Sequence, residues 1–447
     1  MRIVVIGAGD VGFYLASRLT DEAHEVVLVD SDPEKFQHAV DNLDVMTILG
    51  SGADPGVLEE AGLARADILM AVSGSEDANL LACLAATRAG VPVRVARVAD
   101  PAAHGPDSLL PAEAFGVDLM ISPERECAWE TFQLLSTEAA TDLVQFAGGR
   151  IRLMGMRLQP DAPVLGKPLR ELDQELRNHR FVLAAVVRDG ETVIPNGGTV
   201  LQADDKVFIV SPTSEVRALP PLAGYAPFRL RRVMIAGGTP EAVHLAGHLG
   251  EHGVACTILE ADAVRSRQLA ELLPGALVLR GDATDMELLQ MEGVEGIDGF
   301  AALSSTDEVN MLVALLAKSC GARRVVPLVH KTDYMDLVER IGLDAAVSPR
   351  ISAANAILRY VRRGSVASVA TVKGSRAEAI EGVIAPGSPL VGQRVKTIRF
   401  PKGSVLGALV RGDRIIMPRG RDRVQAGDHA IFFVLPEALV AVGKMLE

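Results

Sequence analysis

Along the chain, short runs of apolar residues alternate with longer stretches in which apolar positions recur at helical spacing. In the first part of the chain, the apolar runs predict strands at 3–6, 26–29, 45–49, 68–72 and 93–95. The stretches between them predict helices at 11–20, 33–40, 55–61 and 77–89. Continuously apolar strands that alternate with helices are typical of a parallel sheet covered on both faces. We therefore predict an α/β fold with a doubly wound, Rossmann-like sheet.

The same pattern returns in the second half of the chain. The strand that begins at Arg2 corresponds to one that begins at Arg232, and the register continues through the loops at 50–54 and 281–285 and the segments at 71–80 and 302–311. Later in each copy, a Ser-Pro pair (122–123 and 348–349) is typical of the start of a helix. Repetition over this length indicates a tandem duplication.

A smaller module also occurs twice. Residues 161–166, 188–195 and 203–210 resemble residues 387–392, 411–418 and 426–433, and their β-branched runs separated by Gly, Pro and Asp predict mostly strands. The order is therefore large, small, large, small. We predict modules at 1–121, 142–218, 230–347 and 365–447, connecting helices within 122–141 and 348–364, and a proline-containing linker at 219–229.

A glycine motif directly follows the first predicted strand and opens the next helix. It reads GxGxxG, with Gly7, Ala8, Gly9, Asp10, Val11 and Gly12 in sequence. Such glycines allow a tight turn, close approach of the backbone to a pyrophosphate, and close packing of helix on strand. The helix N-terminus also offers free N–H groups to the anion. Asp30 ends the second strand, where a carboxylate accepts ribose hydroxyl protons and repels a 2′-phosphate. This copy predicts a site for NAD(H).

The second copy of the motif is degraded. It reads Gly237, Gly238, Thr239, Pro240 and Glu241, followed further on by Glu260 at the ribose position. The branched side chain of Thr239 intrudes where the backbone should approach a phosphate. Pro240 removes an amide donor, and Glu241 adds a negative charge. Nucleotide binding and a purely structural role both remain open for this copy, and we expect the two sites to differ.

Other candidates follow strands of the first module, at the edge where open α/β sheets bind ligands. Ser51 is a candidate for the adenine side, Ser73 and Gly74 for the phosphates or nicotinamide, and Arg97 for neutralising phosphate charge. In the second copy Leu328 takes the place of Arg97. Loop capping by the serines and an ordinary surface charge at Arg97 are the alternatives.

Composition narrows the classes of partner. The 447 residues include 45 Lys and Arg against 57 Asp and Glu, a net charge of −12, which argues against nucleic acid as the main partner. The four cysteines lie far apart and form no CxxC pair, as expected in a reducing compartment. We find neither a signal-peptide layout nor an apolar stretch of membrane-spanning length, so we expect a cytoplasmic protein, which could still dock on a membrane protein.

Taken together, the doubled module order, the motif at 7–12, Asp30, the loop at 50–54 and the segment at 73–79 resemble the TrkA family over essentially the whole chain. These are the peripheral NAD-binding subunits of bacterial Trk potassium uptake systems, and their modules are called RCK-N and RCK-C. The resemblance implies a homotetrameric ring at the inner face of the membrane, beneath a potassium-translocating subunit of the TrkH or TrkG type. It also implies that NAD(H) and ATP/ADP bias the ring between conformations.

Carried over residue by residue, the resemblance implies two sets of nucleotide contacts. The first comprises Gly7–Val11, Asp30, Ser51, Ser73, Gly74 and Arg97. The second comprises Gly237–Glu241, Glu260 and Asp282, although Thr239-Pro240-Glu241 departs from the glycine pattern.

The competing class is an NAD-dependent oxidoreductase. Such an enzyme needs a proton donor or acceptor near the transferred hydride and a pocket for its substrate. The sequence contains no HExxH, nucleophile-elbow or P-loop lysine motif, and His104, His179 and His429 form no persuasive catalytic set. We therefore favour a non-enzymatic regulator, with the oxidoreductase as the alternative.

Overall fold

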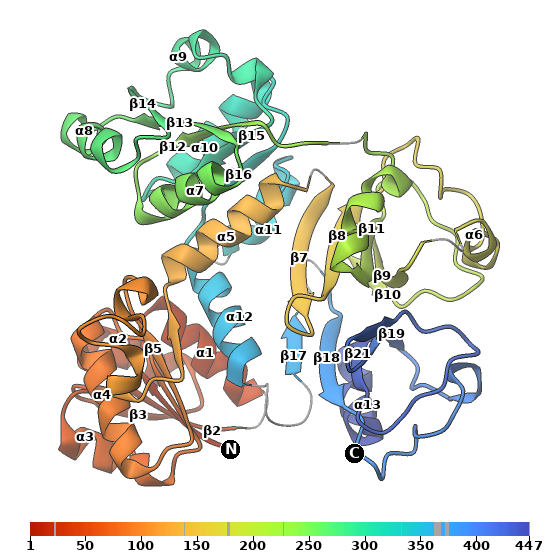
Figure 1. Cartoon of the computed structure of the whole chain (residues 1–447), viewed down its shortest axis with the longest axis horizontal. Helices are drawn as coiled ribbons and strands as arrows, with labels where there is room; N and C mark the ends of the chain where they lie inside the picture. The colour runs from red at the N-terminus through yellow and green to blue at the C-terminus, as the bar shows by residue number, and fades with distance from the viewer. Residues whose placement is uncertain are drawn as a thin grey trace.

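The chain folds into two parallel and two antiparallel sheets that alternate along the sequence (Figure 1). The computed structural model describes residues 1–21, 24–137, 139–176, 179–226, 228–331, 333–361, 368–371 and 375–446. Each parallel sheet is followed by a smaller, mostly antiparallel domain. The predicted fold class, two Rossmann-like domains in tandem with two small domains, is confirmed.

The first Rossmann domain is built on a six-stranded parallel sheet in the order β3-β2-β1-β4-β5-β6. Its strands are β1 Arg2–Ile6, β2 Glu25–Asp30, β3 Met46–Leu49, β4 Ile68–Ala71, β5 Val93–Arg97 and β6 Leu119–Ile121. Its helices are α1 Asp10–Asp21, α2 Pro33–Asn42, α3 Pro55–Glu60 and α4 Glu76–Ala89. The apolar runs place the first five strands within two residues, whereas they miss β6. That strand has only three residues, two of them half-buried, so its apolar signal is short.

The second Rossmann domain repeats this order with a five-stranded sheet, β14-β13-β12-β15-β16. Its strands are β12 Arg232–Ala236, β13 Ala255–Glu260, β14 Leu277–Arg280, β15 Gly299–Ala302 and β16 Val325–Pro327. Its helices are α7 Pro240–Glu251, α8 Ala263–Leu272, α9 Met286–Met291, α10 Asp307–Ser319 and α11 Asp333–Arg340. A single parallel bridge between Leu328 and Val347 lies where β6 lies in the first copy.

The two small domains have matching antiparallel sheets that share a core. The first contains β7 Ala140–Phe146, β8 Ile151–Arg157, α6 Leu169–Glu175, β9 Val182–Arg188, β10 Glu191–Val193 and β11 Lys206–Pro212. The second contains β17 Ser368–Thr371, β18 Glu378–Val383, β19 Ser404–Arg411, β20 Arg414–Ile416, β21 His429–Val434 and α13 Leu439–Leu446. Phe146 of the first sheet meets Phe433 of the second edge to face, with ring centroids 6.0 Å apart. This shared core fixes the two small domains against each other.

The same ion pair, between a half-buried arginine and a buried aspartate, occurs in both small domains. Arg188 donates two hydrogen bonds of 2.7 Å to the Asp205 carboxylate, and Arg411 donates bonds of 2.7 and 2.8 Å to Asp428. Each carboxylate is 1% exposed and also accepts a backbone N–H from the preceding turn. Bidentate geometry and the extra N–H satisfy a charge that burial alone would disfavour.

Two connecting helices cross in the middle of the molecule (Figure 1). They are α5, Pro123–Leu135, and α12, Pro349–Val361, and each begins at the proline of the predicted Ser-Pro pair. α5 packs on α7 of the second Rossmann domain, and α12 packs on α1 of the first. Ile357 of α12 shares a buried core with Leu15 of α1. The connecting helix of each unit thus packs on the Rossmann domain of the other unit.

The first residues of the predicted linker are folded and packed against the core. Pro220–Ala223 form a 3-10 helix, and Ala223 is buried in the core that joins the first small domain to the second Rossmann domain. The Ala223 carbonyl accepts the N–H of Gln159, whose side chain donates to the Tyr225 hydroxyl at 2.8 Å. This anchoring restricts how far the second unit can move relative to the first.

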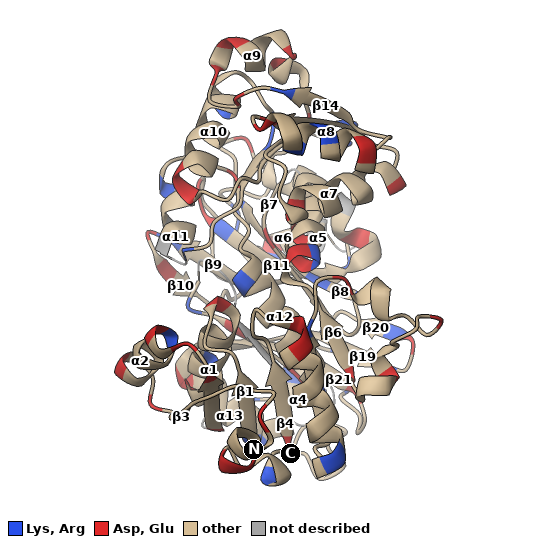
Figure 2. Cartoon of the chain, turned by 90° about the vertical axis from the view of Figure 1, so that its left-hand side faces the viewer, with Lys and Arg blue, Asp and Glu red and all other residues tan. Residues whose placement is uncertain are grey.

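Charged residues of both signs lie close together on the face shown in Figure 2, for example along α2, α4 and α8. Because positive and negative side chains are interspersed there, that face carries no extended region of a single charge. None of the helices in the described part of the chain combines the length and the apolar character that crossing a bilayer requires.

Candidate nucleotide-binding site

The glycine motif forms the turn between β1 and α1 in the first Rossmann domain. Gly7 has a φ of +100°, and a Cβ there would lie 2.6 Å from the Cα of Ser73. A Cβ on Gly12 would lie 1.8 Å from the Gly7 carbonyl oxygen. Both positions therefore require glycine for the turn itself. At Gly9 a Cβ would meet no atom within 4 Å, so this backbone faces open space. Gly9 is where a ligand can approach the main chain closely.

Asp30 ends β2 beside this turn. One carboxylate oxygen accepts the N–H of Ala8 at 2.5 Å, and the other accepts the N–H of Asp32 at 2.8 Å. Two backbone donors fix the carboxylate next to the loop, at the position expected for a ribose contact. Each oxygen retains acceptor capacity for a ligand hydroxyl.

Asn79 organises the loop after β4. Its buried side-chain amide donates to the carbonyls of Ser73 and Arg97, at 3.0 and 2.9 Å, and its oxygen accepts both the N–H and the hydroxyl of Ser73. In the second domain Asn310 makes the corresponding bonds to Ser304 and Leu328. Asn79 therefore holds the ends of β4 and β5 together at the rim of the site.

These elements enclose a cavity of about 770 Å³. Of the predicted residues, Ala8, Gly9, Asp10, Val11, Asp30, Ser73, Gly74 and Arg97 line it. Gly7 and Gly12 shape the turn behind it. Ser51 does not line the cavity, because its hydroxyl instead caps its own loop by accepting the N–H of Ala53 at 3.2 Å.

Among the lining residues that the sequence did not predict as site residues, four carry aromatic or basic side chains. They are Phe13, Lys35, His38 and Arg350. Phe13 and His38 stack with ring centroids 4.8 Å apart, and both line the cavity. No motif marks Phe13, Lys35 or His38, since they lie on helix surfaces. Arg350 comes from α12 of the second unit, and no spacing within the first module could have found it.

The second glycine turn encloses a smaller cavity, of about 300 Å³. Gly237, Gly238, Thr239, Glu260 and Asp282 line it, whereas Pro240 and Glu241 lie outside the lining, in the first turn of α7. The Thr239 hydroxyl donates to the Leu303 carbonyl at 3.0 Å, so its side chain occupies the space that stays open above Gly9. The asymmetry expected between the two copies has this steric basis.

The ribose position differs as well. A Cβ on Gly238 would lie 2.7 Å from a carboxylate oxygen of Glu260, so the missing side chain makes room for the longer acid. Arg265 donates to the Gly238 carbonyl at 2.7 Å and covers the same loop. The carboxylate of Asp282 accepts the N–H and hydroxyl of Thr284, and these bonds lower the pKa of Asp282. Oδ1 of Asp282 thus holds its own loop closed.

The contact between Glu76 of α4 and His104 connects the loop at 99–110 to that helix, and both residues are titratable. The Glu76 carboxylate accepts the N–H of Ala99 at 2.7 Å and lies 3.0 Å from Nε2 of His104, whose Nδ1 lies 2.8 Å from the Leu110 carbonyl. With an acceptor at each ring nitrogen, the protonated imidazole is favoured, and the pKa of His104 is raised, chiefly by Glu76. The pKa of Glu76 is lowered, chiefly by the Ala99 N–H.

We expect the attachment of this loop to weaken as pH rises. A raised pKa in the folded state means that the contribution of His104 is present at low pH and lost as pH rises through that pKa. The ionised Glu76 persists throughout this range, because its own pKa is lowered. Amide hydrogen exchange over residues 99–110 should therefore lose protection as pH rises beyond the ordinary histidine pKa of 6.5.

The control for this experiment is His104→Ala, in which the pH-dependent part of that protection should disappear. Protection in β1 should stay constant in both proteins, after correction for intrinsic exchange rates. A variant that keeps the wild-type pH profile would rule out His104 as the titrating group.

Two family models match the chain, each twice. The TrkA-N domain model matches residues 3–123 and 233–349, and the TrkA-C domain model matches residues 153–223 and 380–446. The matches thus follow the four folded domains and cover most of the chain.

Curated relatives match over nearly their whole length. The Trk system potassium uptake protein TrkA of Halomonas elongata is 35% identical over 97% of this chain and 96% of its own. The protein of the same name from Vibrio alginolyticus is 33% identical over 99% of this chain and 97% of its own.

Solved structures share the fold at lower identity. The GsuK RCK domain, at 19% identity, matches with a TM-score of 0.61 over 100% of this chain and 94% of its own. A GsuK channel bound to NAD, also at 19% identity, matches with a TM-score of 0.62 over 100% of this chain and 78% of its own. With two tandem TrkA-N and TrkA-C domains and relatives similar over their full length, this chain belongs to the TrkA family.

Proposed function

We propose that this chain is a nucleotide-binding regulatory subunit of a potassium uptake system and that NAD(H) binds in its first Rossmann domain. One observation carries the proposal: the open space above Gly9, with Asp30 fixed beside it, in a cavity of about 770 Å³. Pyrophosphate would meet the loop amides at the N-terminus of α1, and Asp30 would accept the ribose hydroxyls. The same carboxylate would repel the 2′-phosphate of NADP.

The names of the relatives support potassium uptake as the process that is regulated. The GsuK structures, described as bound to NAD and to ADP, show that the shared fold accommodates both kinds of nucleotide in another protein. By analogy, we propose that ATP or ADP also binds here, and that four chains form a ring beneath a membrane subunit of the TrkH or TrkG type. In this proposal the chain is cytoplasmic and held at the membrane by its partner.

Regulation then follows from linkage. A nucleotide can shift such a ring between conformations only by the difference in its affinity for them. The first site is lined by Arg350 of α12, a helix of the other unit, so a ligand there would contact both units of the chain. Rigid-body movement of these units would carry the signal to the membrane partner.

We expect Asp30→Ala to weaken NADH binding roughly 10- to 100-fold, because the ribose hydroxyls lose a charged acceptor. Titration calorimetry on the purified full-length protein measures this. Asp107→Ala, which removes an exposed carboxylate away from the cavity, should bind as the wild type does. Unchanged affinity in Asp30→Ala would contradict the assigned ribose position.

The wider proposal is tested by co-purification with the membrane transporter encoded beside it, followed by potassium flux into vesicles with and without NADH and ATP. Nucleotide-dependent flux supports the regulatory role. Steady NADH oxidation with any of a panel of small carbonyl substrates would instead favour the oxidoreductase.

A further inference from the structure

Two arginines line the first nucleotide cavity, and they come from different units of the chain. Arg97 ends β5 of the first Rossmann domain and donates to Glu124 at 2.9 Å. Arg350 lies in the first turn of α12, in the second unit. α12 is seated on the first Rossmann domain by apolar residues that include Ala353 and Ile357, which are fully buried. The guanidinium of Arg350 therefore reaches the cavity from a well-anchored helix.

Arg350 is incompletely paired in this position. Its Nη1 lies 3.9 Å from a carboxylate oxygen of Asp10, which is beyond hydrogen-bond distance, and its guanidinium lies over the ring of Tyr14 at 5.7 Å. Its side chain is only 19% exposed, and Nε is buried with no hydrogen-bond partner among the described residues. No residue in the described part of the chain accepts a hydrogen bond from the guanidinium, so its Nη groups at the cavity suit an added anion.

Among the residues that the structure describes, no Lys or Arg lines the second cavity. Aligning the two Ser-Pro pairs places Glu124 of α5 at the position of Arg350, and the repeat places Leu328 at the position of Arg97. Glu124 is committed elsewhere, since it accepts hydrogen bonds from Arg97 and from the Ser122 hydroxyl. Both positive charges are thus specific to the first site, where the glycine turn is also intact.

We propose that Arg350 is a phosphate ligand of the first nucleotide site, supplied by the second unit of the same chain. Phosphoryl oxygens of the bound nucleotide take the place of the distant Asp10 carboxylate and accept hydrogen bonds from the guanidinium. Charge-assisted bonds of this kind are about twice as strong as neutral ones. The nucleotide thereby bridges the glycine turn of the first Rossmann domain and the first turn of α12. This inference rests on the proposed function, and it adds how the ligand of that site is coupled to the second unit.

The experiment compares the full-length wild type with Arg350→Gln, Arg350→Lys and Asp10→Asn, with NADH and ATP as probes in titration calorimetry. Arg350→Gln should bind at least one of the two nucleotides about 10- to 100-fold more weakly, and Arg350→Lys should recover part of that loss. Asp10→Asn should bind the same nucleotide more tightly, because it removes the competing carboxylate. Arg88→Gln removes an equal charge at an exposed position of α4 and should leave the affinity unchanged.

Amide hydrogen exchange supplies a second readout. Nucleotide should increase protection across α12 in the wild type, and this increase should be absent in Arg350→Gln even at saturating ligand. Wild-type affinity together with wild-type protection of α12 in Arg350→Gln would overturn the inference while leaving the proposed site intact. A wild-type protein that binds neither nucleotide would instead overturn the proposed function, so the two failures are distinguishable.

Discussion

Gly9→Thr is expected to abolish measurable NADH binding to the first site while the protein remains folded. A Cβ at this position meets no protein atom within 4 Å, so the backbone of the empty turn leaves room for a side chain to start there. It would nevertheless fill the space through which a pyrophosphate reaches the loop amides. The second copy already contains this residue: Thr239 bonds to the Leu303 carbonyl and closes its own turn. We expect affinity to fall by at least roughly 100-fold, about 3 kcal/mol of binding free energy.

Titration calorimetry with NADH measures the loss, and circular dichroism with a thermal melt checks the fold. The matched control is Gly247→Thr, because Gly247 lies exposed on α7, far along the sequence from the turn, and also has no atom within 4 Å of its Cβ position. It should leave thermal stability unchanged or slightly raised, because glycine is a poorer helix former than threonine, and it should leave NADH affinity unchanged. If Gly9→Thr bound NADH as tightly as the wild type, the phosphate could not lie against this turn.

The shape of the first glycine turn and the position of Asp30 beside it were largely predictable, because this geometry is encoded locally. The turn at Gly7 needs a positive φ, and close contact with the neighbouring carbonyl excludes a side chain at Gly12, so both demands appear as glycines within six residues. Asp30 follows from the length of one strand-helix-strand unit. Ser51 was a candidate on the same reasoning, but a hydroxyl at a strand end can equally cap its own loop, and here it does.

The exchange of connecting helices was not predictable in the same way. α5 and α12 both carry apolar residues that either Rossmann domain could bury, and the sequence pattern does not say which domain does so. That choice depends on contacts between segments far apart in the chain, such as Ile357 with Leu15. Arg350 was missed for the same reason: its position at the first site exists only because α12 crosses to the other unit.

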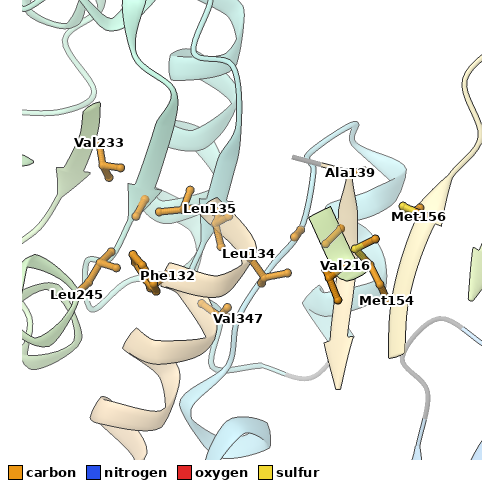
Figure 3. Close-up of a cluster of buried hydrophobic side chains, with 14 of the residues drawn as sticks. Phe132, Leu134, Leu135, Ala139, Met154, Met156, Val216, Val233, Leu245 and Val347 are labelled. Carbon is orange, nitrogen blue, oxygen red and sulfur yellow. The ribbon is translucent and has the colours of Figure 1, made fainter. Parts of the chain in front are cut away.

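Leu135→Ala is expected to give the largest loss of stability among the substitutions considered. Leu135 ends α5, is fully buried, and lies among side chains of the second Rossmann domain that include Val233 and Leu245 (Figure 3). Its Cδ2 lies 3.0 Å from the Cβ position of Gly299 in β15, so the leucine fills space directly against that sheet. Truncation removes this packing and leaves a cavity, which should lower the free energy of unfolding by about 2–5 kcal/mol.

Thermal unfolding of the full-length protein should show a midpoint several degrees below that of the wild type. The matched control is Leu109→Ala, which makes the same chemical change at a leucine that is 96% exposed, and it should alter stability by less than about 0.5 kcal/mol. Because both variants replace leucine by alanine, a difference between their unfolding midpoints reports the effect of burial. Because Leu135 belongs to the first unit and its contacts to the second, equal midpoints for the two variants would mean that α5 is not seated on the second Rossmann domain. A clear difference would establish the packing of α5 on the second Rossmann domain as a stabilising feature of the chain.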